Sequence, residues 1–501
     1  MILPGRGVSL PRMKRREPSL LRELETHFGR HQDRYLAEWI ALLRIPSVSA
    51  DPAHRQDCAR CAEWLARRLA RLGFKPRLLK TRAHPAVFAQ RPGARDAPTV
   101  LFYGHYDVQP ADPLAAWTTP PFDPHVRAGR VYARGAEDNK GQLMYVLAAM
   151  ETLIAQNAPL PALKILLEGE EECGSAGLSE ALPRWRHLLR ADILLVADTG
   201  TAASGAPAII MGLRGIMHAS IALTGPKHDL HSGMHGGVAP NPATEMARLL
   251  ATLHTPDGAI AVPGFARGVV APTRRERALA NAEAVAPRAY RRTTGVPPAA
   301  GEKDFTPAER LGFRPSIDVN GIHAGYSGRG IKTIIPARAE AKITARLARG
   351  QEPAAALRAL IRHLEAHAPA GLRLRVTEKG ISGPALRINP DSPLVAKARR
   401  VLSLLSRQEP ALLWEGASIP VITALARSSG AEPLLVGFGH DKDRVHAPNE
   451  SFSLQQFKRG YLYAALMLRA IADASFLPAE KKHSPSGFAA GSSVDEDAKR
   501  T

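Results

Sequence analysis

The sequence contains few of the residues that build disulfide frameworks or nucleic-acid stacking surfaces. Only three cysteines occur among 501 residues, too few for a disulfide framework, and none has the paired spacing of a zinc finger. Lys and Arg outnumber Asp and Glu by 67 to 47, but aromatic residues make up only 5%, so a nucleic-acid groove lined with stacking side chains is not expected. No apolar run approaches the roughly 18 residues of a membrane span. These absences predict a protein without nucleic-acid or membrane partners.

The N-terminal residues 1–16 carry charges and lack the apolar segment and small-residue cleavage site of a signal peptide. Together with the low cysteine content, this leads us to expect a reducing, cytoplasmic compartment. The hydrophobic fraction of 45% against 23% charged residues predicts a globular core of one or two domains. Cys58 and Cys61 form a CxxC pair, but they share one helical face with Leu65 and Leu69, so we interpret them as core residues.

Short apolar runs at residues 97–103, 163–167 and 193–197 alternate with helical patterns. This alternation predicts an α/β fold, with a mainly parallel sheet and helices on both of its faces. After Gly215 the pattern changes to strands of alternating polarity. The expected strands are 216–223, 316–319, 339–347 and 372–376, and the expected helices are 241–254 and 353–367. We therefore predict an inserted α+β domain with an antiparallel sheet.

The expected boundaries follow from these changes of pattern. The first domain is assigned to residues 26–215 and 390–476, and the inserted domain to residues 216–389. Residues 1–25 are expected to form a flexible extension. Residues 477–501, rich in Ser, Gly, Lys and Asp, are expected to be a disordered tail.

Histidines and carboxylates follow several of the predicted strands, where parallel sheets gather their reactive groups. The segments are 104–110 (GHYDVQP), 134–142 (RGAEDNKGQ), 168–175 (EGEEECGS), 197–200 (ADTG) and 446–450 (HAPNE). A single histidine is more often structural, and a run of glutamates is usually a solvated surface. Here the run 170–172 directly follows a buried strand, where like charges repel unless a cation or proton compensates. Five such segments together favour a zinc or manganese site that needs no thiolate.

The five segments, in this order, resemble the co-catalytic dimetal amidohydrolases, which include carnosine dipeptidase, aminoacylase, acetylornithine deacetylase, succinyl-diaminopimelate desuccinylase and glutamate carboxypeptidase. The resemblance covers roughly residues 31–472 and implies a zinc-exopeptidase-like catalytic domain with an inserted lid domain that forms dimers. It implies two divalent metal ions, most simply Zn²⁺, with Mn²⁺ or Co²⁺ as alternatives. The ligands it implies are His105, Asp138 and Asp198 for one ion, and Asp138, Glu172 and His446 for the other, with Asp138 bridging.

The same resemblance implies roles for two further acids. Asp107 would orient His105 through its second ring nitrogen, and Glu171 would be the general base. Two cations about 3.5–4 Å apart can lower the pKa of a shared water toward about 7 and polarise a scissile carbonyl. Spacing alone could not decide which glutamate of the run takes which role.

Segments of the inserted domain resemble the substrate side of the family's site. Residues 231–237 (HSGMHGG) are similar to the segment whose first histidine reaches the other subunit's active site. His231 would then donate to the developing oxyanion, and the chain would be a homodimer, whereas His235 is interpreted as a turn residue. The implied substrate-binding residues are Asn320, Thr333 and Arg346, with Gly416 and Ser418 in a further loop. Arginine suits a carboxylate clamp, although an arginine near a strand end is as often merely exposed.

The loop 415–420 (EGASIP) departs from the family pattern, because Ala417 stands where a second glycine is common and Trp414 precedes it. This predicts a narrowed substrate pocket. We predict a hydrolase that cleaves dipeptides or small peptides, since residues 106–110 and the long segment 273–314 are closest to the dipeptidases. The alternative is an N-acyl-amino-acid amidohydrolase. A non-catalytic binding protein would lack a metal ligand or the general base, and none is missing here. A serine hydrolase would need a G-x-S-x-G elbow after a strand, and no such elbow follows a strand in this sequence.

Overall fold

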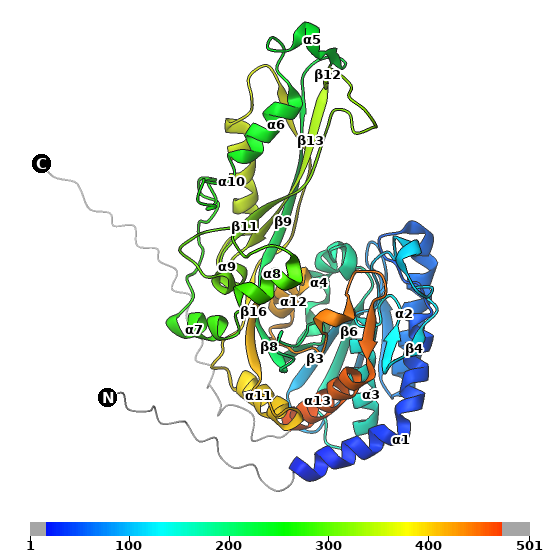
Figure 1. Ribbon diagram of the computed structural model, residues 1–501. Coiled ribbons are helices and arrows are strands. Elements are labelled where there is room, and N and C mark those ends of the chain that lie inside the picture. Colours follow the sequence, from blue (N-terminus) through cyan, green and yellow to red (C-terminus); the bar gives the residue numbers. More distant parts are fainter. Residues whose placement is uncertain (1–16, 473–501) are drawn as a thin grey trace, which may run out of the picture.

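The computed structural model describes residues 17–472 and contains two separate large sheets (Figure 1). The larger sheet has nine strands and lies in the body of the molecule, and a four-stranded sheet extends away from it. Each sheet has its own hydrophobic cluster, as expected for two layers that each bury one face. Residues 1–16 and the predicted tail 477–501 lie outside the described part of the chain.

The centre of the nine-stranded sheet is parallel. Strand β3 (Thr99–His105) lies between β6 (Ala162–Glu168) and β7 (Ile193–Val196), and β7 pairs in parallel with β17 (Glu432–Leu435). The outer pairings are mostly antiparallel. The outer strands are β1 (Lys75–Leu79) and β2 (Ala86–Arg91) on one side, and β8 (Ala208–Leu213), β15 (Leu386–Arg387) and β16 (Ala411–Glu415) on the other, with β16 parallel to β8. The predicted α/β fold with a mainly parallel core is therefore confirmed.

Helices cover this sheet because their apolar faces bury against it. The helices of one layer contact each other and are α1 (Glu17–Leu43), α3 (Lys140–Ala155), α11 (Pro393–Leu405) and α13 (Leu454–Ala472). Helix α2 (Arg55–Arg71) packs on β1 and β2, and α4 (Ala176–Leu189) packs on α12 (Pro420–Ser429). Cys58 and Cys61 are fully buried on α2, as expected for core residues. No helix between residues 17 and 472 has the length and hydrophobicity that crossing a bilayer requires.

Helix α1 begins at Glu17, inside the range expected to form a flexible extension. Its residues Leu24, Phe28, Tyr35 and Trp39 are buried against the body of the protein. Successive members of this set are four or seven residues apart, which is the spacing of one face of an α-helix. The sequence therefore did carry the signal of a helix, and the prediction of a flexible extension was wrong for this part.

The four-stranded sheet belongs to the inserted segment. Its antiparallel strands lie in the order β11 (Ser316–Ala324), β13 (Arg338–Leu347), β9 (Gly215–Thr224) and β14 (Arg373–Gly383). Every second residue of β9 and β13 is buried, so one face packs on α6 (Pro242–Ala251) and α10 (Pro353–Ala366). At its far end, β10 (Leu230–His231) pairs with β12 (Ile334–Ile335) beside the short helix α5 (Ser232–His235) (Figure 1).

The segment between α6 and β11 forms helices α7 (Arg274–Ala282), α8 (Pro287–Thr294) and α9 (Pro307–Phe313). Although it falls within the predicted inserted domain, Ala280 and Phe313 pack into the core of the larger sheet. This part of the insertion therefore shares the core of the first domain. The exact domain limits stay a prediction. A small third sheet is formed by β4 (His125–Arg127), β5 (Arg130–Tyr132) and β18 (Ser451–Ser453).

Candidate metal centre

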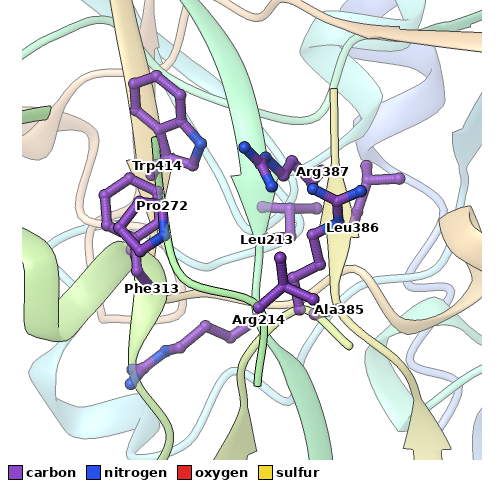
Figure 2. A pocket seen from close by; sticks show the side chains of 11 residues that line it. Leu213, Arg214, Pro272, Phe313, Ala385, Leu386, Arg387 and Trp414 are labelled. Carbon is purple, nitrogen blue, oxygen red and sulfur yellow. The ribbon is translucent and has the colours of Figure 1, made fainter. Parts of the chain in front are cut away.

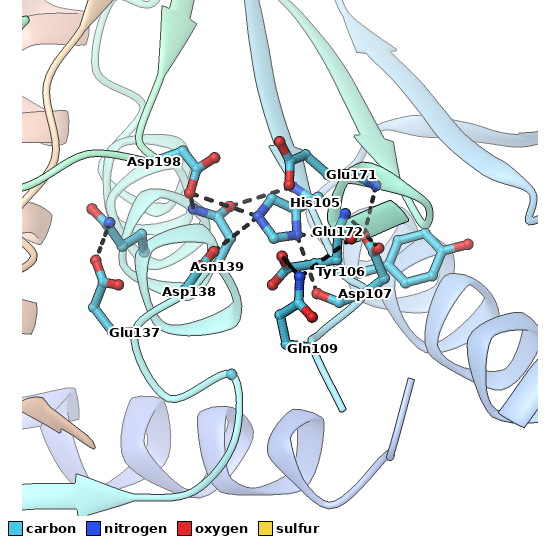
Figure 3. Close-up of polar contacts among 12 residues, drawn as sticks. His105, Tyr106, Asp107, Gln109, Glu137, Asp138, Asn139, Glu171, Glu172 and Asp198 are labelled. Atoms are coloured by element: carbon cyan, nitrogen blue, oxygen red, sulfur yellow. Dashed lines mark hydrogen bonds and ion pairs between the residues drawn. The ribbon is translucent and has the colours of Figure 1, made fainter. Parts of the chain in front are cut away.

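Five segments that are distant in sequence meet at the carboxyl end of the parallel strands. His105 is the last residue of β3, the glutamate run follows β6, and Asp198 follows β7. Asp138 precedes α3, and His446 lies in the loop after β17. Because neighbouring parallel strands end at the same edge, their following residues converge there, and Figure 3 shows His105 between Asp198 and Asp138 on one side and Asp107 on the other.

The converging side chains form two groups whose potential ligand atoms lie within 4.8 Å of one another. The groups are His105, Asp138 and Asp198, and Asp138, Glu172 and His446. The His105 Nε2 atom lies 3.0 Å from one Asp138 oxygen and 3.6 Å from Asp198 Oδ1. The His446 Nε2 atom lies 2.9 Å from the other Asp138 oxygen and 3.2 Å from Glu172 Oε2. Asp138 thus presents one oxygen to each group.

The electrostatics of these groups favour a bound cation. Burial together with the Asp138 charge raises the pKa of Glu172 to about 7. Hydrogen bonds to Asp138 and Glu172 raise the pKa of His446 to about 10. Burial lowers the pKa of His105, but Asp198 and its other acidic neighbours outweigh it and hold the pKa well above the usual value. The acids thus stabilise positive charge between them, and imidazole nitrogens with carboxylate oxygens are a donor set that fits Zn²⁺ or Mn²⁺.

Asp107 lies behind the first group and organises it. Its side chain is fully buried, and one carboxylate oxygen lies 3.4 Å from Nδ1 of His105, which also lies 3.1 Å from the Asp107 carbonyl. The Asp107 carboxylate accepts hydrogen bonds from the backbone N–H groups of Glu171 at 3.2 Å and Glu172 at 3.0 Å. One carboxylate therefore orients a candidate ligand and fixes the turn that carries both glutamates.

Glu171 belongs to neither ligand group, although it follows the same strand end as Glu172. Burial raises its pKa well above the usual value, and the charges of Asp198, Glu172 and Asp138 raise it further, against the opposing effect of His105. A carboxylate with a raised pKa, close to a cation site and outside its ligand set, has the properties of a proton acceptor.

Two amides that sequence reasoning did not assign support the candidate ligands. Asn139 donates from Nδ2 to Asp198 Oδ1 at 2.8 Å, and its Oδ1 accepts from the backbone N–H of His105 at 3.3 Å. Gln109 donates from Nε2 to Glu172 Oε2 at 2.9 Å. Asn139 lies in the segment 134–142 and Gln109 in the segment 104–110, each one or two residues from an acid of the site. That proximity is the sequence signal by which both amides could have been found.

The predicted substrate-binding residues separate into two places. Near the junction of the two sheets, Arg346 on β13 donates from Nη1 to Ser418 Oγ at 2.7 Å. Arg214, which sequence reasoning missed, lies between β8 and β9 and donates from Nε to the carbonyl of Gly416 in this loop at 3.1 Å. Trp414 is buried between this loop and the insertion, and Figure 2 shows it beside Phe313 in a small pocket also lined by Arg214 and Arg387.

The other predicted substrate residues, like Arg346, lie on the inserted segment. His231 precedes α5 at the far end of the four-stranded sheet, is exposed, and its Nδ1 accepts from the Gly233 N–H at 3.0 Å. Thr333 lies beside it, because its carbonyl accepts from the Ser232 N–H at 3.0 Å. Asn320 is exposed at a bulge in β11. Within one chain, His231 does not join the metal-ligand groups (Figure 1).

The parallel sheet, the paired ligand groups at its carboxyl edge and the separate lid-like sheet define the class of two-domain metallohydrolases. The model of peptidase family M20/M25/M40 matches residues 101–470. Because that match covers more than half of the sequence, the chain belongs to this peptidase family, and it is an enzyme of the metallopeptidase type, as the sequence predicted.

Relatives and solved structures match along most of their length. The chain is 28% identical over 445 residues to the Cys-Gly metallodipeptidase dug1 of Schizosaccharomyces pombe, covering 86% of this chain and 94% of the relative. It is 28% identical over 474 residues to the Beta-Ala-His dipeptidase of Homo sapiens, covering 90% and 93%. The crystal structure of the metallo-carboxypeptidase Sso-CP2 of Sulfolobus solfataricus superposes with a TM-score of 0.78 at 29% identity, covering 87% and 99%.

Proposed function

We propose that this enzyme is a two-metal dipeptidase that holds two Zn²⁺ ions. The observation that carries the proposal is that Asp138 presents one oxygen to each of two ligand groups, while Glu171 lies beside them and joins neither. His105 and Asp198 complete one ligand set, and Glu172 and His446 the other. Bound zinc supplies a water of lowered pKa and polarises the carbonyl of the scissile amide.

The residues of the chain divide the remaining work. Asp107 holds His105 in the orientation for ligation. Glu171 accepts the proton of the attacking water and returns it to the leaving amine. Arg346 binds the substrate carboxylate with a charge-assisted hydrogen bond, beside the loop that carries Gly416 and Ser418. In this arrangement the reaction requires a small substrate with a free carboxylate next to the cleaved amide.

The proposal includes a homodimer formed through the inserted domain, residues 216–389, with the catalytic domain built from residues 26–215 and 390–476. His231 lies at the far end of the insertion, where it is exposed and distant from the ligands of its own chain. In a dimer it would donate to the oxyanion in the partner's site, with Thr333 and Asn320 close to the same substrate. A cytoplasmic location is part of the proposal and is compatible with three free cysteines.

The dipeptidase function is preferred over the N-acyl-amino-acid amidohydrolase because two relatives with extensive coverage are named dipeptidases. The test uses purified protein stripped of metal and resupplied with Zn²⁺, Mn²⁺ or Co²⁺. Each form is incubated with a panel of dipeptides and N-acyl amino acids, and released amino groups are detected with ninhydrin. We expect metal-dependent cleavage of dipeptides. Preferential cleavage of N-acyl amino acids would favour the deacylase, and no cleavage by metal-loaded protein would reject both.

A further inference from the structure

Glu450 closes the loop that carries Asp138. Its side chain is 1% exposed, and its Oε2 accepts from the Gly135 N–H at 2.9 Å, while its Oε1 accepts from the N–H groups of Glu137 at 3.0 Å and Asp138 at 3.2 Å. Its backbone carbonyl accepts from the Ala133 N–H at 3.1 Å. One residue thus satisfies four backbone donors of residues 133–138. Successive N–H groups that converge in this way form a nest for an anion.

A buried ion pair extends this clamp to two further ligand segments. Arg134 is 1% exposed and donates from Nη1 to Glu450 Oε2 at 2.7 Å. Its Nη2 donates to the carbonyl of Pro110 at 3.0 Å, in the segment that begins with His105. Glu450 itself ends the loop that carries His446. The pair therefore connects the segments of three candidate ligands, and its two members are 316 residues apart in the sequence.

We infer that Glu450 is a positioning residue that fixes Asp138 between the two metal ions. This inference rests on the proposed two-metal centre. Asp138 must direct two oxygens at different partners, so a small rotation of its backbone would disturb both ligand groups. Hydrogen bonds that orient ligands in this way typically change metal affinity by about 10–100-fold when they are lost. Because Asp138 is common to both groups, loss of Glu450 weakens both zinc-binding steps.

A purely structural carboxylate would behave differently, and the chain offers a matched control. Glu276 is also fully buried, is paired with Arg387, and accepts from the Thr273 N–H at 2.7 Å. It lies at the start of α7 and belongs to neither ligand group. Glu450→Gln and Glu276→Gln remove the same charge from comparable surroundings. A general loss of stability affects both variants, whereas a loss of metal affinity affects only the first.

The experiment is a competition titration of metal-free, full-length protein with Zn²⁺ in the presence of a chromophoric chelator, together with thermal unfolding of each variant. We expect Glu450→Gln to bind zinc about 10–100-fold more weakly in both steps, and Glu276→Gln to bind it as the wild type does. Equal zinc affinity in Glu450→Gln and wild type would overturn the inference. Weakening of only one step would also overturn it, because Asp138 would then not be the residue affected.

Glu450→Asp covers the case in which Glu450→Gln does not fold. Aspartate keeps the charge opposite Arg134 but is one methylene too short to reach all three N–H groups, so we expect the same two-step weakening in a folded protein. Wild-type affinity in folded Glu450→Asp would contradict the proposed positioning. Failure of the wild type to bind zinc would instead refute the metal centre itself, so the two failures are distinguishable.

Discussion

The division of labour between the adjacent glutamates is open to a direct test. Glu172 lies 3.2 Å from His446 and belongs to a ligand group, whereas Glu171 belongs to none. Glu171→Gln preserves the size of the side chain and removes the proton acceptor. We therefore expect Glu171→Gln to keep both metal ions and lose activity, and Glu172→Gln to lose affinity for one ion.

The expected loss of kcat in Glu171→Gln depends on whether another acid can replace Glu171 as the proton acceptor. Asp138, Glu172 and Asp198 belong to the ligand groups, and Asp107 accepts from two backbone N–H groups beside His105. With those carboxylates engaged, no neighbouring acid among them can take over the proton. A general base contributes about 10²–10⁴-fold to kcat, equivalent to about 2.7–5.4 kcal/mol of activation free energy at about 1.36 kcal/mol per factor of ten. We expect the loss in Glu171→Gln to fall in the upper half of that range.

The assay combines steady-state kinetics on a cleaved dipeptide with elemental analysis of the same protein samples. Glu171→Gln should show two metal ions per chain, a reduced kcat and a nearly unchanged KM. Glu172→Gln should bind one ion more weakly than the wild type does, because a candidate ligand carboxylate is lost. If Glu172→Gln kept both ions and lost kcat while Glu171→Gln lost an ion, the assignment would be shifted by one residue and the reasoning refuted.

Three further predictions concern the shared ligand, the dimer and the substrate carboxylate. Asp138→Ala should remove both ions in elemental analysis, and loss of one ion alone would show that Asp138 is not shared. Mixing inactive Glu171→Gln and His231→Ala chains should restore activity in heterodimers, since one of their two sites has both groups; no recovery after exchange confirmed by mass would exclude His231 from the partner's site. The wild type should cleave a dipeptide about 10–100-fold more efficiently than its C-terminal amide, because a hydrogen bond to a charged group contributes about 1.5–3 kcal/mol. If Arg346→Ala discriminated between the two substrates as strongly as the wild type does, Arg346 would not be the residue that binds the carboxylate.

The central strands could be predicted because each is a short apolar run followed by polar residues, as β3 is by His105 and Asp107. The outer strands β1 and β8 and the helix α1 were not predicted. The edge strand β1 has no buried residue and carries charge, so it lacks the apolar run of a central strand. The charged residues at the start of α1 made its buried face hard to recognise from the sequence. The helices α7 and α9 pack on the first domain, a long-range contact that local periodicity does not encode.

The candidate ligands could be listed from the sequence, but their geometry could not. Convergence of His105 and His446 depends on pairing between strands that are hundreds of residues apart, and only the resemblance ordered them into two sets. The supporting contacts of Asn139, Gln109 and Glu450 depend on the conformation of each side chain, which residue spacing does not determine. Spacing could not place His231 at the far end of the insertion either, since that position follows from the register of β9 against β13.

The chain as a whole carries a net positive charge, whereas acidic side chains dominate the candidate metal centre. The local charge of this centre determines which ions bind there. Lys and Arg exceed Asp and Glu by 20 over the whole sequence, yet Asp138, Asp198, Glu171 and Glu172 gather at one sheet edge. Dissolved salt screens exposed charges over about 10 Å at 0.1 M ionic strength, whereas it screens buried groups much less. The field at the strand ends is therefore set by the local carboxylates, which attract divalent cations in a protein whose composition alone suggests anionic partners.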